Sequence, residues 1–173
     1  MQKLVEKVLN IATLERGLIT IEREEIDIHS IIFKSMESFR FEFCHKTVEV
    51  SYHFDATNPV ILADKVHIRN IINNLVDNAV KYSDEIPKIE IKTSNLEGFI
   101  QIEISDKGKG IPKELQKKVF DKFFRGHSGN VHNVKGFGLG LYYAKTTVEL
   151  HGGKIELDSL PNQGTRVIIL LPQ

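Results

Sequence analysis

Apolar residues recur at every third or fourth position through the middle of the chain. They are Ile68, Ile71, Ile72, Leu75, Val76, Ala79 and Tyr82. This spacing predicts the buried face of a helix over 69–83. Asp64 precedes the helix and is placed to cap its start. The opposite face gathers polar residues that are mostly amides, namely Asn70, Asn74, Asp77, Asn78 and Lys81.

The same patterns divide the rest of the chain into short elements. Helical periodicity predicts further helices over 1–14, 29–44, 112–120 and 139–150. Runs of alternating apolar and polar residues, bounded by turn residues, predict strands over 48–54, 60–62, 89–93, 99–105, 154–157 and 165–171. An extended stretch is predicted over 18–27. Residues 125–135 hold glycines and polar side chains among few apolar ones, which indicates a mobile loop. Together these elements predict an α+β fold, a two-layer α/β sandwich whose mixed, mostly antiparallel sheet carries about three helices on one face.

Composition and charge exclude several classes of protein. The 173 residues are enough for one domain with a proper core. Lys plus Arg and Asp plus Glu both number 23, so there is no basic excess and we expect no nucleic-acid partner. The lone Cys44 excludes an internal disulfide and a cysteine-based zinc cluster. No apolar run approaches the ~18 residues that span a bilayer, and no signal peptide opens the sequence.

The amide-rich stripe needs an explanation of its own. Asn competes for backbone groups through its side chain, so the four Asn in the nine residues 70–78 lower helix stability. An Asn carbonyl oxygen suits a hard cation such as magnesium. Lys81, one turn beyond Asp77 and Asn78, is placed to meet a phosphate. The alternative is an exposed amide face without a ligand, and this stretch alone does not decide between the two.

Two glycine-rich stretches add candidate binding chemistry. Asp106 ends a predicted strand and precedes Gly108 and Gly110, which puts a carboxylate that can accept from an amine beside backbone that can approach a flat ligand. The plainer alternative is a glycine turn capped by Asp106. The second stretch, 136–141, holds three glycines and runs into a helix whose first N–H groups can bind phosphate. Its sequence matches neither a Walker loop nor the dinucleotide fingerprint.

In their order and spacing, these stretches resemble the ATP-binding catalytic domain of bacterial sensor histidine kinases. The wider superfamily, with its Bergerat ATP-binding fold, includes gyrase, MutL-type repair proteins and the 90-kilodalton heat-shock chaperone. The resemblance covers about residues 28–172. Its five motifs are an N box at 70–83, a first glycine box at 106–110, an F box at 120–125, a second glycine box at 136–141 and the pair Gly164-Thr165.

The resemblance implies ATP and magnesium as ligands and a role for each motif residue. Asn78 would ligate magnesium, and Asp106 would receive the adenine amine. Asn74 and Arg125 would be the catalytic residues, Asn74 near the phosphates and Arg125 as a mobile phosphate contact beside the lid at 125–135. The other implied nucleotide-binding residues are Lys81, Tyr82, Gly108, Gly110, Ile111, Phe124, Gly136, Gly138, Leu139, Gly140, Leu141 and Thr165.

By the same resemblance, the reaction would transfer the γ-phosphoryl group of ATP to a protein histidine. The related ATPases carry a Glu four residues before the metal-binding Asn, where this chain has Asn74. A neutral amide is a poor general base, so we expect phosphotransfer rather than ATP hydrolysis. Two alternatives stay open: a module that binds nucleotide or a partner without transferring phosphate, and an ATPase of the gyrase or chaperone kind.

None of the seven histidines lies in the His-Glu motif of a phosphoacceptor helix. We therefore expect the acceptor on a dimerisation domain outside this sequence, with 1–25 as the end of the second dimerisation helix and its linker, and 26–173 as the catalytic domain. The implied partners are that histidine-bearing domain and, through the intact kinase, a response regulator. We expect this chain to be a monomer that faces the cytoplasm, and its parent to be a homodimer anchored in the bacterial inner membrane.

Overall fold

The computed structural model describes residues 20–42, 47–83, 86–125 and 137–173. Its elements, in chain order, are β1 (Glu24–Asp27), α2 (Ile28–Glu42), β2 (Glu49–Phe54), β3 (Val60–Ala63), α3 (Lys65–Lys81), β4 (Lys88–Leu96), β5 (Phe99–Asp106), η1 (Lys118–Phe120), α4 (Gly140–Leu150), β6 (Lys154–Leu160) and β7 (Gly164–Pro172). The helix predicted over 1–14 and most of the loop predicted over 125–135 lie outside the described residues.

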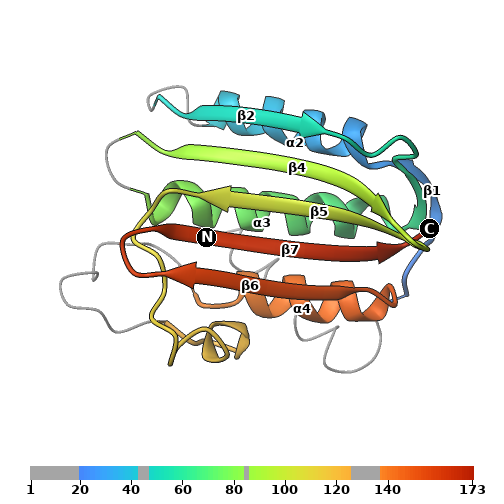
Figure 1. Cartoon of the computed structure of the whole chain (residues 1–173). Helices are drawn as coiled ribbons and strands as arrows, with labels where there is room; N and C mark the ends of the chain where they lie inside the picture. The colour runs from blue at the N-terminus through green and yellow to red at the C-terminus, as the bar shows by residue number, and fades with distance from the viewer. Residues whose placement is uncertain (1–19, 43–46, 84–85, 126–136) are drawn as a thin grey trace.

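Five strands form one sheet in the order β2-β4-β5-β7-β6, while β1 and β3 pair separately. Strands β2 and β4 run parallel, and the other neighbouring strands run antiparallel. Helices α2, α3 and α4 lie together behind the five-stranded sheet (Figure 1). The predicted two-layer α+β sandwich with a mixed, mostly antiparallel sheet is therefore confirmed.

The core lies between the sheet and the helices because both layers turn an apolar face inward. Strand β5 buries Ile100, Ile102 and Ile104 at alternate positions, as the period of a strand requires. Helix α3 buries the predicted face from Ile68 to Ala79. The prediction is wrong for Tyr82, which is 43% exposed. Helix α3 ends one residue earlier, so Tyr82 is its C-cap and leaves the buried face.

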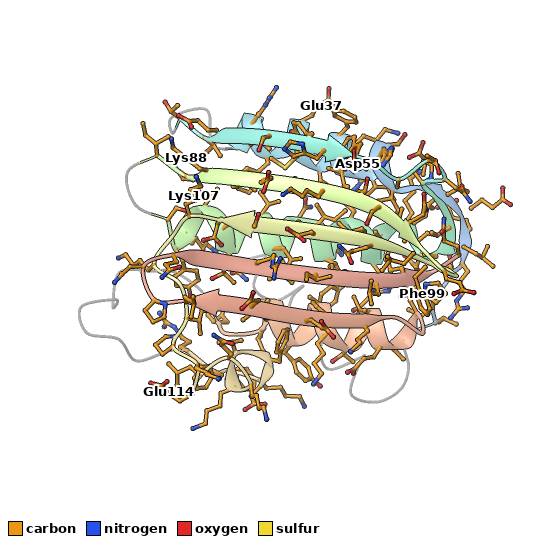
Figure 2. The ribbon with its side chains drawn as sticks, viewed as in Figure 1. Glu37, Asp55, Lys88, Phe99, Lys107 and Glu114 are labelled. Carbon is orange, nitrogen blue, oxygen red and sulfur yellow. The ribbon has the colours of Figure 1, made fainter. Side chains whose placement is uncertain are left out.

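The opposite face of the five-stranded sheet carries mainly polar and charged side chains (Figure 2). Lys88 Nζ lies 3.1 Å from Glu49 Oε2, and an Arg166 guanidinium nitrogen lies 2.8 Å from Asp158 Oδ2. These exposed ion pairs each contribute little to stability. No helix in the described parts of the chain is long and apolar enough to cross a membrane.

Asp64 caps helix α3, as predicted. Its Oδ1 accepts hydrogen bonds from the backbone N–H groups of Val66 and His67 at 2.9 and 3.0 Å. Its Oδ2 accepts from the backbone N–H of Glu22 at 3.1 Å, which ties the segment before β1 to the start of α3. Burial by itself would raise the pKa of Asp64, but these N–H donors and the nearby His67 hold that pKa below its ordinary value.

The helix predicted over 112–120 is wrong. This segment forms consecutive tight turns, and a short 3₁₀ helix is found at Lys118–Phe120. The reason is a tertiary contact: Gln116 Nε2 donates to Ile111 O at 3.1 Å and to Ser159 O at 2.6 Å. These bonds hold the segment as compact turns against β6, in place of a regular α-helix.

Candidate functional site

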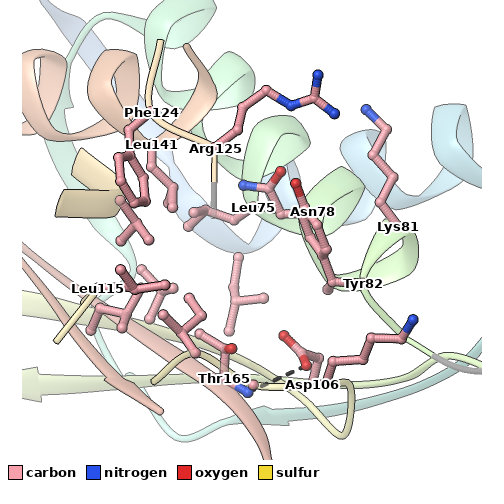
Figure 3. A pocket seen from close by; sticks show the side chains of 18 of the residues that line it. Leu75, Asn78, Lys81, Tyr82, Asp106, Leu115, Phe124, Arg125, Leu141 and Thr165 are labelled. Carbon is pink, nitrogen blue, oxygen red and sulfur yellow. Dashed lines mark hydrogen bonds between the residues drawn. The ribbon is translucent and has the colours of Figure 1, made fainter. Parts of the chain in front are cut away.

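A pocket opens where β5 ends and β7 begins, between α3 and the turns that follow the first glycine stretch (Figure 3). The predicted site residues that line it are Asn78, Lys81, Tyr82, Asp106, Gly110, Ile111, Phe124, Arg125, Gly138, Leu141 and Thr165. Four others, Asn74, Gly108, Leu139 and Gly140, lie outside its lining. Gly136 lies outside the described residues.

Asp106 lies at one end of the pocket, at the last position of β5. Its Oδ1 accepts hydrogen bonds from the backbone N–H groups of Gly108 at 2.8 Å and Thr165 at 3.3 Å. Figure 3 shows the other carboxylate oxygen turned toward the pocket. Burial raises the pKa of Asp106, and the two N–H donors oppose that rise because they stabilise the carboxylate. The arrangement leaves Oδ2 to accept from an amine on a ligand.

Gly108 and Gly110 let the chain pass close to its neighbours around Asp106. A Cβ on Gly108 would lie 2.4 Å from Tyr82 O, and a Cβ on Gly110 would lie 1.9 Å from Leu160 O. Gly110 also has a φ of +64°, in the left-handed region that favours glycine. The first glycine box therefore packs the backbone against the end of α3 and the end of β6.

Asn78 and Lys81 project from α3 on the opposite wall of the pocket (Figure 3). Lys81 Nζ donates to Asp77 Oδ2 at 2.5 Å. The Asn78 carboxamide lines the pocket and has no hydrogen-bond partner among the described residues. The guanidinium of Arg125 extends along the same side as the Lys81 ammonium group. An amide oxygen beside two cations suits a ligand that carries phosphates and a metal ion.

The second glycine box leads into helix α4. A Cβ on Gly138, which has a φ of +68°, would lie 2.5 Å from Phe124 O. Leu139 is buried and is the N-cap of α4, but its side chain makes no capping hydrogen bond. The N-cap side chain therefore does not compete with an anion for the first backbone N–H groups of α4. A Cβ on Gly140 would lie 3.6 Å from Asn74 Oδ1, so Asn74 lies against the start of α4.

The predicted amide stripe divides along α3. Asn78 and Lys81 line the pocket, whereas Asn74 lies beside the start of α4. Asn70, at the N-terminal end of the stripe, lies outside the pocket lining. The C-terminal part of the stripe belongs to the pocket, and the N-terminal part lies outside it.

Sequence analysis missed the apolar walls of the pocket. The main ones are Leu75, Ile104, Leu115, Val119, Leu157 and Val167. Several of these are core positions of strands and helices, so their periodicity indicated burial but no ligand. Lys109, from the first glycine box, also lines the pocket.

Comparison with known proteins identifies the family. Residues 63–173 match the family described as histidine kinase-, DNA gyrase B- and HSP90-like ATPase. The chain belongs to this family. It is 45% identical over 170 residues to the sensor protein RprX of Bacteroides fragilis, a match that covers 97% of this chain and 33% of RprX. It is 33% identical over 175 residues to the sensor histidine kinase WalK of Bacillus subtilis, covering 99% of this chain and 28% of WalK. The chain thus spans about a third of the length of these relatives.

Solved structures agree with the family. The catalytic domain of histidine kinase ThkA superposes with a TM-score of 0.76 at 27% identity, over 87% of this chain and 95% of that one. Full-length ShkA in complex with AMPPNP superposes with a TM-score of 0.84 at 25% identity, over 98% of this chain and 35% of ShkA. The chain is an ATP-binding catalytic domain of the kind found in sensor histidine kinases.

Proposed function

We propose that this domain transfers the γ-phosphoryl group of ATP to a histidine on a dimerisation domain of the same kinase, for relay to a response regulator. The observation that carries the proposal is the division of the pocket into two ends. Asp106 lies at one end, and Asn78, Lys81 and Arg125 lie at the other. Such a division suits a nucleotide, because the amine of its base needs a hydrogen-bond acceptor and its phosphates need cations.

The end with Asp106, which we call the base end, would hold the adenine ring. Asp106 Oδ2 would accept a hydrogen bond from the exocyclic amine. Apolar side chains such as Leu115, Leu157 and Val167 line the same pocket and would remove the ring from water. Burial of that kind contributes about 25 cal/mol per Å² of apolar surface.

At the phosphate end, Lys81 and Arg125 would neutralise negative charge, and the N–H groups at the start of α4 would bind phosphate oxygens. Phosphoryl transfer asks a protein mainly for positioning and charge stabilisation. Arg125 would stabilise charge on the transferring group, which is why we propose it as a catalytic residue.

Magnesium fits this end of the pocket. The described residues contain no group of three or more His, Cys, Asp or Glu that could hold a metal ion. A magnesium ion would therefore take few protein oxygens and use phosphates and water for the rest, as is usual for this ion in phosphate sites. We assign Asn78 as its protein ligand because the carboxamide lines the pocket without a protein partner among the described residues. When bound, magnesium would neutralise charge on the phosphate oxygens.

Asn74 favours a histidine acceptor over water. Its carboxamide lies beside the start of α4, and a neutral amide cannot activate water as a general base does. A histidine acceptor brings its own nucleophilic nitrogen, so the catalytic domain has no need to supply a base.

We propose the following place for the domain in a larger kinase. Residues 1–25 would be the end of the second dimerisation helix and its linker, and 26–173 the catalytic domain. The parent would be a homodimer anchored in the inner membrane, with this domain in the cytoplasm where ATP is available. The domain by itself would be monomeric.

Replacing Asp106 tests the proposed nucleotide site. We expect the wild-type chain to bind ATP in a magnesium-dependent manner in isothermal titration calorimetry. Asp106→Asn should weaken binding roughly 10- to 100-fold, because the bond to a charged acceptor is lost. Asp55→Asn, which removes an exposed carboxylate beyond the end of β2 (Figure 2), is the matched control and should bind as the wild type does.

Phosphotransfer is then tested with γ-labelled ATP and a separately purified histidine-bearing domain. The label should move to that domain in the presence of the wild-type chain, and Asn78→Ala should abolish the transfer. Equal ATP affinity in the wild type and Asp106→Asn would contradict the proposal that the base end holds the adenine ring. Steady ATP hydrolysis without any histidine acceptor would support the ATPase alternative.

A further inference from the structure

Ser159 is a buried hydroxyl, 5% exposed, behind the base end of the pocket. Its Oγ lies 2.8 Å from Ile111 N, 2.7 Å from Gly164 O and 3.0 Å from Thr165 Oγ1. It therefore joins the turns after the first glycine box to the hairpin between β6 and β7. The proposed function gives this residue no role.

Two of these three bonds have a fixed direction. The backbone N–H of Ile111 can only donate, and the carbonyl of Gly164 can only accept. Ser159 has one hydroxyl hydrogen and two lone pairs, so it donates to Gly164 and accepts from Ile111. Its remaining lone pair faces Thr165, which must then donate its hydroxyl hydrogen to Ser159. The Thr165 oxygen keeps only lone pairs for any further contact.

Thr165 lines the pocket next to Asp106 (Figure 3). The Asp106 Oδ1 atom already accepts from Gly108 and Thr165 backbone N–H groups, which leaves Oδ2 for a ligand. The base end therefore presents two acceptors side by side, Asp106 Oδ2 and Thr165 Oγ1. An amino group can donate two hydrogens, whereas a carbonyl oxygen can only accept.

We propose that Ser159 is a positioning residue for base specificity: by fixing the direction of the Thr165 hydroxyl, it makes the pocket select a purine with an amino group at C6 over one with a carbonyl there. The inference rests on the proposed function, because it takes the base end to hold a purine ring. A polar site discriminates strongly when the wrong ligand leaves its groups unpaired.

The test compares the affinities of ATP and inosine triphosphate, ITP, which carries a carbonyl at C6. Both are measured by isothermal titration calorimetry with magnesium on the 173-residue chain. In Ser159→Ala the Thr165 hydroxyl can turn and donate to the ITP carbonyl. The preference for ATP over ITP should then fall about fivefold, the value of one net hydrogen bond.

Gln116→Ala is the matched control. Gln116 Nε2 donates to Ile111 O and Ser159 O, so its loss loosens the same turns without touching the Thr165 hydroxyl. Loosening of the turns should weaken the binding of ATP and ITP by the same factor and leave the ratio of their affinities unchanged. An equal fall of the ratio in Gln116→Ala and Ser159→Ala, or no fall in Ser159→Ala, would overturn the proposal.

Thr165→Val provides a test that does not depend on the folding of Ser159→Ala. If the hydroxyl is an acceptor, the variant should bind ATP about fivefold more weakly and ITP no more weakly than the wild type does. Weaker binding of ITP alone would overturn the proposal, as would a wild-type chain that binds both nucleotides equally. If the wild-type chain binds neither nucleotide, the result would instead contradict the proposed function.

Discussion

Gly164 begins β7 with a φ of +90°, and a Cβ there would lie 1.9 Å from Asp106 O. Gly98 lies in the turn between β4 and β5 with a φ of +74°, but a Cβ there would meet nothing within 4 Å. The two glycines therefore share a left-handed backbone and differ in crowding. Gly164 brings the start of β7 against Asp106, which is what lets the Thr165 N–H reach the carboxylate.

This difference predicts unequal effects of adding one methyl group. Gly98→Ala should lower the free energy of unfolding by about 1–2 kcal/mol, the cost of a left-handed L-residue. Gly164→Ala should cost at least ~2 kcal/mol more, since the backbone of β5 or β7 must move. Urea unfolding of both variants measures the two losses. Equal losses would show that the contact with Asp106 O is not tight in solution.

At the scale of elements, His151 joins the end of α4 to the start of α3. Its Nδ1 donates to Thr147 O at 2.8 Å, and its Nε2 accepts from Asp64 N at 3.0 Å. Only the neutral imidazole can make both bonds, because the protonated ring has no acceptor. Burial lowers the pKa of His151, the bond to Thr147 O opposes the change, and the positive charge of Arg23 adds to the lowering.

The lowered pKa predicts that acid weakens the fold through this residue. The unfolded chain takes up the proton near the ordinary pKa of about 6.5, and the folded chain only at lower pH. The stabilising contribution of His151 is therefore complete above about pH 6.5, the unfolded-state pKa. It is lost as the pH falls through the pKa of the folded state. The free energy of unfolding in urea should decrease from pH 7.5 to 5.5, by at most about 1.4 kcal/mol per pH unit from this proton.

His151→Gln provides the comparison. The variant should be less stable at pH 7.5, and its unfolding free energy should depend less on pH between 7.5 and 5.5. Asp64, whose pKa is lowered from 3.8, titrates below this window. The same pH dependence in both chains would assign the effect to other groups.

At the scale of the whole molecule, one core joins both sheets to the helices. It includes Ile26 of β1, Ile61 of β3, Ile72 of α3 and Ile169 of β7. The pocket is built on the margin of this core, because α3 and β7 contribute residues to both. A cavity in the core should therefore lower the stability of the entire described fold.

Truncating one core side chain tests whether the described fold unfolds as a single unit. Ile72 is 0% exposed and Val66 is 66% exposed on the same helix. Ile72→Ala should lower the free energy of unfolding by about 2–5 kcal/mol, whereas Val66→Ala should change it by about 0.5 kcal/mol or less. Unfolding followed by circular dichroism and by tyrosine fluorescence should give coincident transitions. Separate transitions would show that the β1–β3 pair unfolds independently.

The sequence predicted most of the fold because strand alternation and helix periodicity act over a few residues. The alternation of β5, the inner face of α3 and the cap at Asp64 all followed from such local patterns. The segment 112–120 did not, because Gln116 Nε2 donates to Ser159 O, which lies 43 positions along the chain. Tyr82 fitted the helical period but lies past the end of α3.

By itself, the sequence determined the order of elements, the polar groups available for binding and the family motifs, since each is written in neighbouring residues. Tertiary structure alone decided which of them meet. It placed Asn78 in the pocket and Asn74 beside the start of α4, set Gly108 against the backbone of Tyr82, and brought Ser159 to Thr165 behind the base end. These outcomes depend on how the sheet and helices pack and how closely backbones approach, and no local pattern records such distances.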